Sequence, residues 1–480
     1  MTEKSYFCET IHIKVAQSDK LTRDYMSTKS EFASKFGLVA ATVGSAVGLG
    51  NVWRFPAEAQ SNGGSAFLLL YILCVLFLGI PVMLAEFSLG RGSKSDAIGS
   101  FLHFSPGKKW WIVGALSVLS SYLIMSYYMV VAGWTLEYLV ESIGGGLYEG
   151  TAGIGHEELR GVFSAKMDEY ISSPVRPVIY TLLLIAINIG ILLGGVQKGI
   201  ERLSNVMMPL LFVILAVMCV VSLMLPNAGE GVKYFLAPDF SKINASTVIN
   251  ALGQAFFSLS LGMGILITFA SYYPRDTRLT RTSVTVAMAS LLVAVMVGLI
   301  IFPAIKSFGL DNEPLEGATL VFVTLPEIFV RLPLAQLWSA LFFILLFVAA
   351  LTSSVSIAEV SIATVQDRLK WSRRTATLAM LLPLTVISTL CALSFSDLSN
   401  VKIFGLTIFD FLDRFTTDIL LPLVSLGVCI YVGWFAPRNL LRDQLTNGGT
   451  LHSPMSRVFL LIIRYIAPLL IAMIFINNYL

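Results

Sequence analysis

Residues 36–59 read FGLVAATVGSAVGLGNVWRFPAEA, an apolar stretch that is long enough to cross a bilayer. Gly44, Gly48 and Gly50, followed by Asn51, interrupt it near the middle of the membrane. In hydrocarbon, a broken helix is tolerated only where the freed backbone groups line a cavity or bind a ligand. The stretch therefore predicts a binding site of the kind that transporters build from interrupted spans. Close packing of helices through small residues is the alternative explanation.

A second apolar stretch, residues 247–272, repeats this feature in the other half of the chain. It contains FFSLSLGMGILITF, which places Ser258, Ser260, Gly262 and Gly264 at mid-span. Interrupted spans at corresponding positions of two halves are the best sequence pointer to a transporter's binding site. The two stretches together therefore favour a site between them.

The composition is that of an integral membrane protein, because 56% of the 480 residues are hydrophobic, only 13% are charged and the mean hydropathy is +0.78. Soluble domains contain about 25% charged residues. The net charge of +3 is small and spread over short loops, which predicts no nucleic-acid partner, and no segment predicts an obligate protein partner. The five cysteines lack paired spacing and the four histidines lie outside the apolar runs, so we expect neither a metal nor a haem site in the membrane. No enzymatic nucleophile and base pair or nucleotide-binding loop is evident, so we expect no enzyme.

Eleven apolar runs are long enough to span about 30 Å of hydrocarbon. A shorter apolar element, 315–330, is too interrupted for a span and is expected to be a loop helix. The predicted span cores are 36–59, 65–89, 111–140, 175–194, 203–225, 247–272, 282–305, 334–366, 375–394, 406–435 and 456–478.

The distribution of Lys and Arg predicts how the chain is oriented in the cell (inner) membrane. With a cytoplasmic N-terminus, the inside segments hold 22 of these residues and the outside segments hold eight. The cytoplasmic side carries the excess of positive charge in membrane proteins. We therefore expect the N-terminus inside and the C-terminus outside. The largest exterior loop, about residues 141–174, is expected to be mobile.

The first ten spans divide into two halves of five, with the glycine-broken spans first in each half. A repeat of odd span number places the second half upside down, which is the inverted symmetry used for alternating access. The predicted fold is therefore an all-α membrane protein with a 5+5 inverted repeat and one accessory helix. Its divisions are a cytoplasmic segment 1–35, a first repeat 36–225, a second repeat 226–435, and a cytoplasmic loop with the eleventh helix, 436–480.

Charged side chains within the spans cost about 2.5–3.5 kcal/mol each at mid-membrane. An Arg from one half and an Asp from the other are suited to close over a bound solute as an ion pair, and a static salt bridge is the alternative. The charged residues in question are Arg54, Glu86, Glu359, Asp410, Asp413 and Asp418.

Several motifs resemble those of one known family. GSAVGLGNVWRFP, followed by NGGSAF at 62–67, is similar to the signature of the bacterial neurotransmitter:sodium symporters, which have the leucine-transporter-type fold. That fold is built with broken helices, which agrees with the two interruptions above. The resemblance extends from about residue 30 onward through SYYMVVAGWTL (126–136), GQAFFSLSLGMG (253–264), GLIIFPAIKSFG (298–309), AALTSSVSIAEV (349–360) and FDFLD (409–413).

The resemblance implies a substrate site at the two breaks. Amide groups at Ala46, Leu49 and Gly50, with the Tyr128 hydroxyl, would bind a carboxylate at the positive end of a half-helix. The substrate's ammonium group would meet the carbonyls of Ala46 and Phe257 and the Ser260 hydroxyl. In isolation, Tyr128 would more often be a packing residue. The substrate's side chain would contact Ile124, Phe257, Met263, Ser353 and Ile357. Ser258, which is also implied as a ligand of the first sodium ion, completes the set of substrate-binding residues.

Two sodium sites are implied in the same way, because sodium is a hard ion that prefers oxygen ligands. The first site would use Ala46, Asn51, Ser258 and Ser290, together with the substrate carboxylate. The second would use the ligands Gly44, Val47, Ala349, Thr352 and Ser353.

The first sodium site departs from the family pattern. Members commonly carry Asn or Asp where this chain has Ser290, and chloride-independent members carry an acid there or one turn later, where this chain has Ala294. The positions that match chloride ligands in other members are Tyr71, Gln254, Ser258 and Ser290. Chloride is therefore a candidate second ion, and a weakened first sodium site is the alternative.

The resemblance also implies two gates. Arg54 and Asp413 match the outer pair with Phe257 as a lid, although Glu58 lies one helical turn from Arg54 and competes for it. Asp367, Tyr272 and Glu359 match the inner closure. The basic partner of Asp367 aligns with Lys29, which lacks the bidentate geometry of Arg. Phe32 stands at the family's usual Trp position.

These observations predict a sodium-coupled secondary active symporter that imports an amino acid by alternating access. Gly48 stands where some relatives carry the carboxylate that holds amine substrates, so the substrate is expected to bring its own carboxylate. Met263 suits a hydrophobic or aromatic side chain, because a methionine adapts its shape. A membrane sensor that binds an amino acid without net transport is the alternative.

Overall fold

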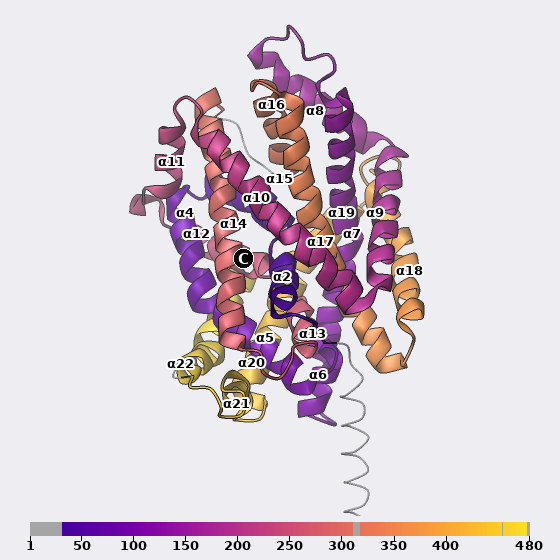
Figure 1. Ribbon diagram of the computed structural model, residues 1–480, viewed down its shortest axis with the longest axis vertical. Helices are drawn as coiled ribbons and strands as arrows, with labels where there is room; N and C mark the ends of the chain where they lie inside the picture. Colours follow the sequence, from indigo (N-terminus) through magenta and orange to yellow (C-terminus); the bar gives the residue numbers. More distant parts are fainter. Residues whose placement is uncertain (1–30, 311–316, 454, 478–480) are drawn as a thin grey trace, which may run out of the picture.

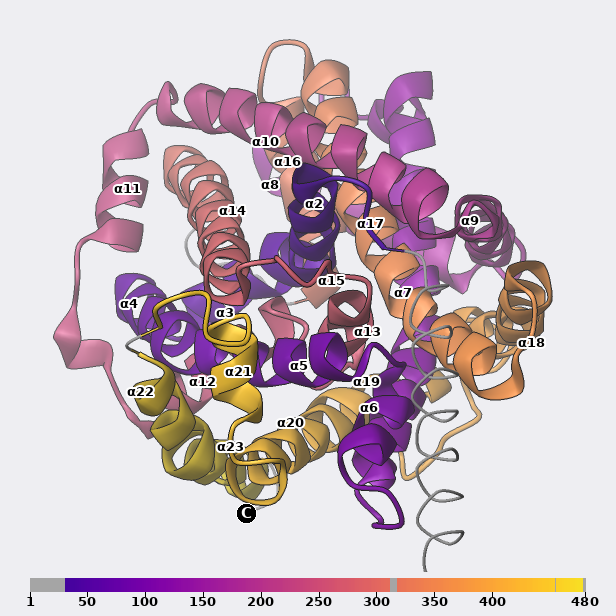
Figure 2. The same cartoon turned by 60° about the horizontal axis from the view of Figure 1, so that its bottom comes forward.

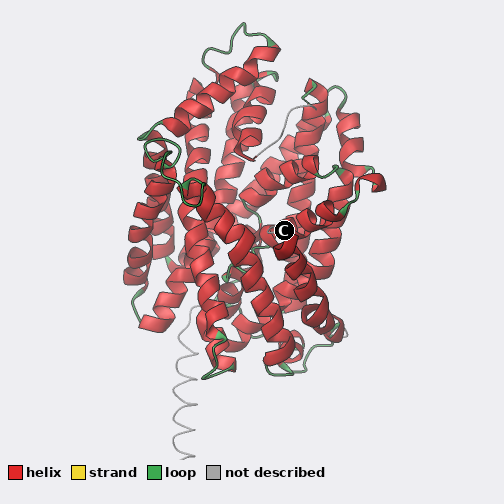
Figure 3. Ribbon diagram, turned by 180° about the vertical axis from the view of Figure 1, so that it is seen from behind, coloured by secondary structure: helices red, strands yellow, loops and turns green. Residues whose placement is uncertain are grey.

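The computed structural model describes residues 31–310, 317–453 and 455–477. All the named secondary-structure elements in this part of the chain are helices, as Figure 3 shows. The fold class predicted from the sequence, an all-α membrane protein, is confirmed.

The helices that correspond to the eleven predicted spans run the length of the molecule. In chain order they are α2 (Lys35–Ala46), η1 (Gly50–Arg54) and α3 (Phe55–Ser61); α4 (Ser65–Cys74), η2 (Val75–Gly79) and α5 (Ile80–Ser93); α7 (Trp111–Gly144); α9 (Arg176–Leu193); η4 (Val196–Glu201) and α10 (Arg202–Leu223); α12 (Ala245–Ser258) and α13 (Ile265–Ser271); α14 (Leu279–Phe308); α17 (Ala335–Leu369); α18 (Arg373–Leu393); α19 (Ile408–Arg414), η7 (Phe415–Leu420), α20 (Leu421–Ile430) and η8 (Tyr431–Phe435); and α22 (Ser456–Leu461), η9 (Ile462–Ile466) and α23 (Ala467–Asn477).

The number of spans depends on how the broken helices are counted. Nine continuous helices of the described residues are long and apolar enough to cross a membrane, and the α2–α3 pair, bent by 50°, makes a tenth. The remaining predicted span, 247–272, consists of α12 and α13, which have 14 and 7 residues and are each too short to cross alone. The division into inverted repeats stays a prediction.

Both breaks have a local cause. Val47 ends α2 in an extended conformation, and a Cβ added to Gly48 would lie 2.5 Å from Ser353 Oγ, so only glycine fits at this close approach. Between α12 and α13 the chain passes through Gly262 and Gly264, whose φ angles are +77° and +72°. These angles belong to the left-handed region that glycine adopts readily. The breaks predicted at the two glycine-rich stretches are therefore present.

Shorter helices cover the two ends of the bundle (Figure 1). The end that carries α8, α11 and α16 is called the α16 end below, and the end that carries α6 and α21 is called the α6 end. These elements are α6 (Ala97–Phe104), α8 (His156–Ser172), α11 (Ala228–Leu236), α15 (Gly317–Thr319), η6 (Leu320–Thr324), α16 (Leu325–Val330) and α21 (Leu440–Leu445). The loop helix predicted at 315–330 is found from Gly317 onward.

The segment between α7 and α9, expected to be a mobile loop, is instead largely helical. Helix α8 buries Leu159, Phe163 and Tyr170 against the bundle. The glycine-rich sequence that suggested mobility, GGGLYEGTAGIG, occupies only the connection that leads into α8. The polar composition of this segment hid its apolar face, which consists of the buried residues Leu159, Phe163, Met167 and Tyr170.

In the tilted view of Figure 2, α2 and α13 lie in the middle of the molecule, with α5, α7, α10, α14 and α17 around them. Their burial agrees, since every residue of α13 from Ile265 to Ser271 is buried. The continuous helices thus surround the two breaks. A site at the breaks is therefore reached only from the ends of the bundle.

Candidate functional site

A pocket lies between the two helix breaks, and the space free of protein atoms there, counted together with its open mouth, is about 360 Å³. All eleven residues that the sequence predicted as substrate contacts line it, together with Ser45, Gly48 and Asn51. They come from four elements that are distant in sequence: the α2 break, α7, the α12 break and α17. The predicted set is therefore brought together at one place.

One side of this cavity is polar. The Tyr128 hydroxyl is buried and has no hydrogen-bond partner among the described residues. Ser260 Oγ donates to the Ser45 carbonyl at 2.7 Å and so ties the two breaks to each other. Helix η1 begins at Gly50, so its positive end adjoins this region. The polar side offers one free hydroxyl and a helix N-terminus, which together suit a carboxylate.

The other side is apolar. Ile124, Met263 and Ile357 are 2%, 4% and 4% exposed, and none of them brings a polar atom to the cavity. Phe257 covers Gly50 so closely that a Cβ there would lie 2.5 Å from its ring. A bound molecule with one zwitterionic end and one apolar end matches this division.

Asn51 and Ser290 form the polar cluster that was predicted as the first sodium site. Asn51 Nδ2 donates to Ser290 Oγ at 2.9 Å and to the Ser290 carbonyl at 3.3 Å. Two acceptors fix the amide in this orientation, because a turned amide would set its oxygen against the carbonyl. Asn51 Oδ1 is consequently buried without a partner. An unpaired buried carbonyl oxygen is costly and suits a bound cation.

The candidate chloride ligands lie next to this cluster. Tyr71 Oη and Ser258 Oγ are 2.8 Å apart and bind each other. Gln254 Nε2 donates to the Gly50 carbonyl at 3.0 Å, which leaves Gln254 Oε1 buried without a partner. The unpaired atoms here are acceptors rather than donors. In this conformation the cluster fits a cation better than an anion.

The residues predicted for the second sodium site also meet. Ser353 Oγ lies 3.1 Å from the Gly44 carbonyl and 3.5 Å from the Val47 carbonyl. Thr352 Oγ1 lies 3.2 Å from the Ala349 carbonyl. All five predicted ligands are thus neutral oxygen groups at one junction of α2 and α17, which is the ligand chemistry that a hard monovalent cation requires.

At the α16 end, the structure differs from the predicted gate. Arg54 Nε pairs with Glu58 Oε1 at 3.5 Å, one turn along the same helix, and no ion pair within 4.0 Å joins Arg54 to Asp413 in the described residues. Neighbours four residues apart on a helix are already in reach, whereas Asp413 lies on α19. The Arg54 guanidinium does lie over the Phe257 ring, 5.1 Å from its centroid. Arg54 and Phe257 therefore cover the cavity together.

At the α6 end, Tyr272 and Glu359 form a buried network, and Asp367 binds separately at the start of α6. Tyr272 Oη donates to Glu359 Oε1 at 2.7 Å. Arg373 donates to both carboxylate oxygens of Glu359, at 2.8 and 2.6 Å. Asp367 accepts the backbone N–H of Asp96 at 2.9 Å. The bidentate partner Arg373 was not predicted, although a carboxylate in a span signals that a cation must lie nearby.

The chain that precedes α2 closes the same end. The Phe32 ring packs against the rings of Phe269 and Tyr272, with centroids 5.9 and 6.3 Å apart. Lys94 Nζ pairs with Glu31 at 2.6 Å. Burial lowers the pKa of Lys94, and the neighbouring Glu31 carboxylate opposes that shift. Lys29, the predicted partner of Asp367, lies outside the described residues.

Glu86 explains another of the charges singled out in the sequence. It is fully buried in α5, and its Oε1 accepts the backbone N–H of Gly262 at 2.8 Å. Ser121 in α7 donates to the neighbouring Met263 carbonyl. Side chains from two continuous helices therefore satisfy backbone groups that the second break leaves free.

A central cavity between two broken helices, lined by neutral oxygens and closed differently at each end, defines a secondary transporter. A sequence model of the sodium:neurotransmitter symporter family matches residues 29–152 and 164–480. The chain is 34% identical over 447 residues to a sodium-dependent transporter of Bacillus subtilis, covering 93% of this chain and 97% of that protein. It is 36% identical over 458 residues to a sodium-dependent transporter of Haemophilus influenzae, covering 94% and 98%. The chain therefore belongs to the sodium:neurotransmitter symporter family, and it is a sodium-dependent transporter rather than an enzyme.

A solved structure has the same fold. The crystal structure of MhsT in complex with L-phenylalanine matches with a TM-score of 0.84 and 39% sequence identity, over 94% of this chain and 100% of that chain. The leucine-transporter-type fold implied by the sequence motifs is thus confirmed.

Proposed function

We propose that the protein is a sodium-coupled symporter that imports an amino acid with a hydrophobic or aromatic side chain. The observation that supports this most directly is the cavity between the two breaks, whose polar and apolar sides match the two ends of such a molecule. MhsT, the structural neighbour, holds L-phenylalanine. The substrate's carboxylate is assigned to the Tyr128 hydroxyl and the start of η1, its ammonium group to the carbonyls near Ser260, and its side chain to Ile124, Met263 and Ile357.

The two oxygen-lined clusters are proposed as sodium sites. Asn51 Oδ1, with Ser258 and the substrate carboxylate, would hold the first ion, and the group around Gly44, Thr352 and Ser353 would hold the second. Two charges moving through a potential of 100 mV supply about 4.6 kcal/mol, since each is worth about 2.3 kcal/mol. That is enough for about thousandfold accumulation, because tenfold takes roughly 1.4 kcal/mol.

Sodium is favoured over chloride at the cluster around Ser290. The free buried atoms there are the acceptors Asn51 Oδ1 and Gln254 Oε1, and an anion would require donors. Uptake is therefore expected to be unchanged when gluconate replaces chloride. Loss of uptake in gluconate with sodium kept constant would reverse this assignment.

The α6 end is proposed to face the cytoplasm of a cell with an inner membrane. Arg91, Lys94, Lys108 and Lys109 flank α6 at this end, in agreement with the excess of positive charge on the cytoplasmic side. The α16 end would then be the side from which the substrate enters.

Uptake into proteoliposomes tests the proposal. We expect labelled L-phenylalanine to accumulate with an inward sodium gradient and not with a potassium gradient of the same size. A screen of the other amino acids as competitors would rank the apolar ones first. Sodium-dependent binding without accumulation would support the sensor instead, and neither binding nor uptake of any amino acid would overturn the substrate class.

A substitution of Gly48 locates the site. The Cβ of Gly48→Ala would lie 2.5 Å from Ser353 Oγ and 3.3 Å from Tyr128 Oη. Overpacking of this kind costs about 1–3 kcal/mol, which weakens phenylalanine binding roughly 5- to 150-fold. Gly190→Ala, in α9, is the matched control because its Cβ would meet no atom within 4 Å. Equal binding by the two variants would place the substrate elsewhere.

A further inference from the structure

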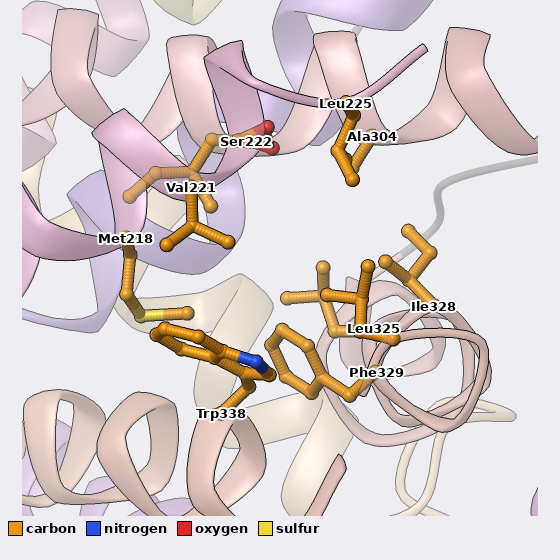
Figure 4. A pocket seen from close by; sticks show the side chains of 11 residues that line it. Met218, Val221, Ser222, Leu225, Ala304, Leu325, Ile328, Phe329 and Trp338 are labelled. Carbon is orange, nitrogen blue, oxygen red and sulfur yellow. Dashed lines mark hydrogen bonds between the residues drawn. The ribbon is translucent and has the colours of Figure 1, made fainter. Parts of the chain in front are cut away.

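A second hollow, distinct from the central cavity, lies at the α16 end between α10, α14, α16 and α17 (Figure 4). We call it the α10–α17 groove. It is a shallow, half-open depression rather than an enclosed cavity, and its walls include Met218, Leu225, Ala304, Phe329 and Trp338. Figure 4 shows Met218 and Val221 facing Leu325 and Phe329 across it, with the Trp338 indole along one side.

The lining of the α10–α17 groove offers no free side-chain hydrogen-bond donor to a polar ligand. Ser222 Oγ donates to the Ile300 carbonyl at 2.6 Å, and Trp338 Nε1 donates to the Pro333 carbonyl at 2.9 Å. Both side-chain polar groups of the lining are therefore satisfied within the protein. A cavity without free polar partners stays dry, so water does not stabilise it. Left empty, its walls lose dispersion contacts.

Exposed apolar residues adjoin the lining of the groove along the chain. Val220 on α10 and Met224 directly after it are 58% and 80% exposed, and Leu334 directly before α17 and Leu337 in its first turn are 69% and 47% exposed. Val220, Met224 and Leu337 directly precede the lining residues Val221, Leu225 and Trp338 in the chain of a membrane-spanning transporter. Trp338 is near the first turn of α17, where Trp commonly marks the edge of the hydrocarbon. The molecules present at this depth are therefore phospholipids with the upper part of their acyl chains.

We propose that the α10–α17 groove binds one acyl chain of a membrane phospholipid. A hydrocarbon chain needs no hydrogen-bond partner, which matches a lining whose polar groups are all paired. A peptide segment would bring backbone carbonyls, and the lining has no free side-chain donor for them, since Ser222 Oγ and Trp338 Nε1 already donate elsewhere. Lipid tails are as apolar as the lining, so selectivity comes from van der Waals packing in the groove rather than from the hydrophobic effect.

The bound chain touches the segment that covers the central site. Leu325, Ile328 and Phe329 of α16 form one wall of the groove. Helix α16 continues directly from η6, whose Phe322 ring lies 6.2 Å from the Trp53 ring. Trp53 precedes Arg54, which covers the cavity. The acyl chain would thus hold α16 and η6 against the first broken helix, and the lipid would stabilise closure of the α16 end.

Brominated phospholipids test the binding step, because bromine quenches a nearby tryptophan. The protein has seven tryptophans, so the Trp338 signal is obtained by subtracting the quenching of Trp338→Phe. Purified protein would be reconstituted with phospholipids brominated either near the headgroup end or near the terminal methyl of the chain. We expect the Trp338 signal to be quenched more by the first, at a lipid fraction that saturates.

Filling the groove is the matched test. In Ala304→Phe an aromatic side chain occupies the groove, and we expect Trp338 quenching to fall about threefold as the chain is displaced. Val213→Phe, at an exposed position of α10 outside the lining, is expected to leave it unchanged. Ala304→Val is the milder variant if Ala304→Phe does not fold. Equal Trp338 quenching in wild type, Ala304→Val and Ala304→Phe would overturn the proposal. Quenching that is lost when the protein is diluted in the membrane would also overturn it, because it would indicate a contact between two copies of the protein.

The consequence for the protein is measured separately from transport. Addition of phospholipid to detergent-purified protein is expected to raise the melting temperature more in wild type and Val213→Phe than in Ala304→Phe, because the groove of the last is already filled. An equal lipid-induced rise in all three would reject the stabilising role. These readouts need no substrate, so they stand or fall independently of the amino acid assigned above.

Discussion

The two closures of the central cavity are built from different interactions. At the α6 end, Glu359 is fully buried and held by Arg373 and Tyr272. At the α16 end, Arg54 and Glu58 have side chains that are 38% and 24% exposed, and they pair along one helix rather than across the cavity. One closure thus joins several helices through buried charges, while the other rests on a partly solvated pair and the Phe257 ring.

The difference indicates which end opens more easily. Separating a buried ion pair leaves an uncompensated charge, which costs about 3–5 kcal/mol, whereas exposed pairs contribute about 0–1 kcal/mol. In the described conformation the α6 end is therefore the firmly closed one. At the α16 end, separating Arg54 from Phe257 breaks no ion pair that joins two helices among the described residues. Substitutions at the two ends test directly whether the α6 end is held closed by the larger free energy.

The largest effect is expected from Arg373→Ala. It leaves the Glu359 carboxylate buried without its bidentate partner, so the closed state should lose about 3–5 kcal/mol. Faster hydrogen exchange of α13 backbone amides and a lower melting temperature would report this loss. Arg374→Ala is the control, because Arg374 is the exposed neighbour. The double variant Arg373→Met/Glu359→Met should recover much of the stability, and its failure to do so would assign the loss to packing.

A smaller effect is expected from Glu201→Gln. Glu201 accepts the backbone N–H groups of Ala33 and Ser34 at 2.8 and 3.0 Å and the Ser34 hydroxyl at 2.7 Å, and so holds the start of α2. Hydrogen bonds to a charged group contribute about 1.5–3 kcal/mol. Hydrogen exchange at the N-terminus of α2 should accelerate correspondingly. The exposed Glu158→Gln on α8 is the control. If hydrogen exchange is unchanged in Glu201→Gln, the anchoring of α2 by Glu201 does not contribute to the closure at the α6 end.

The smallest effect is expected from Glu58→Gln. A pair of residues four apart on a helix surface contributes only about 0.2–0.5 kcal/mol, and salt weakens it further. Melting temperature should hardly change. If Asp413 then becomes the partner of Arg54, the combined Glu58→Gln/Asp413→Asn variant should differ from the sum of the single variants. Strict additivity would show that Arg54 does not pair with Asp413 in either state.

The sequence was informative about the breaks because the constraint is local. A glycine-rich interruption of an apolar span needs a structural reason whatever surrounds it, and both interruptions are broken helices. The family motifs then indicated the cavity residues, which lie far apart in the chain and yet line one space. Helix α8 was not foreseen, since its apolar face of a few residues is hidden in a polar composition.

Composition, hydropathy and glycine position by themselves determined that the chain spans the membrane many times and is interrupted at two points. Only the tertiary structure decided that Arg54 pairs with Glu58, that Arg373 neutralises Glu359, and that α10, α14, α16 and α17 leave a dry groove between them. The physical reason is the range of the interactions. Burial preference and backbone freedom are properties of each residue and its neighbours, whereas the partner of a charge and the fit of packed helices depend on distances between segments that the sequence does not place.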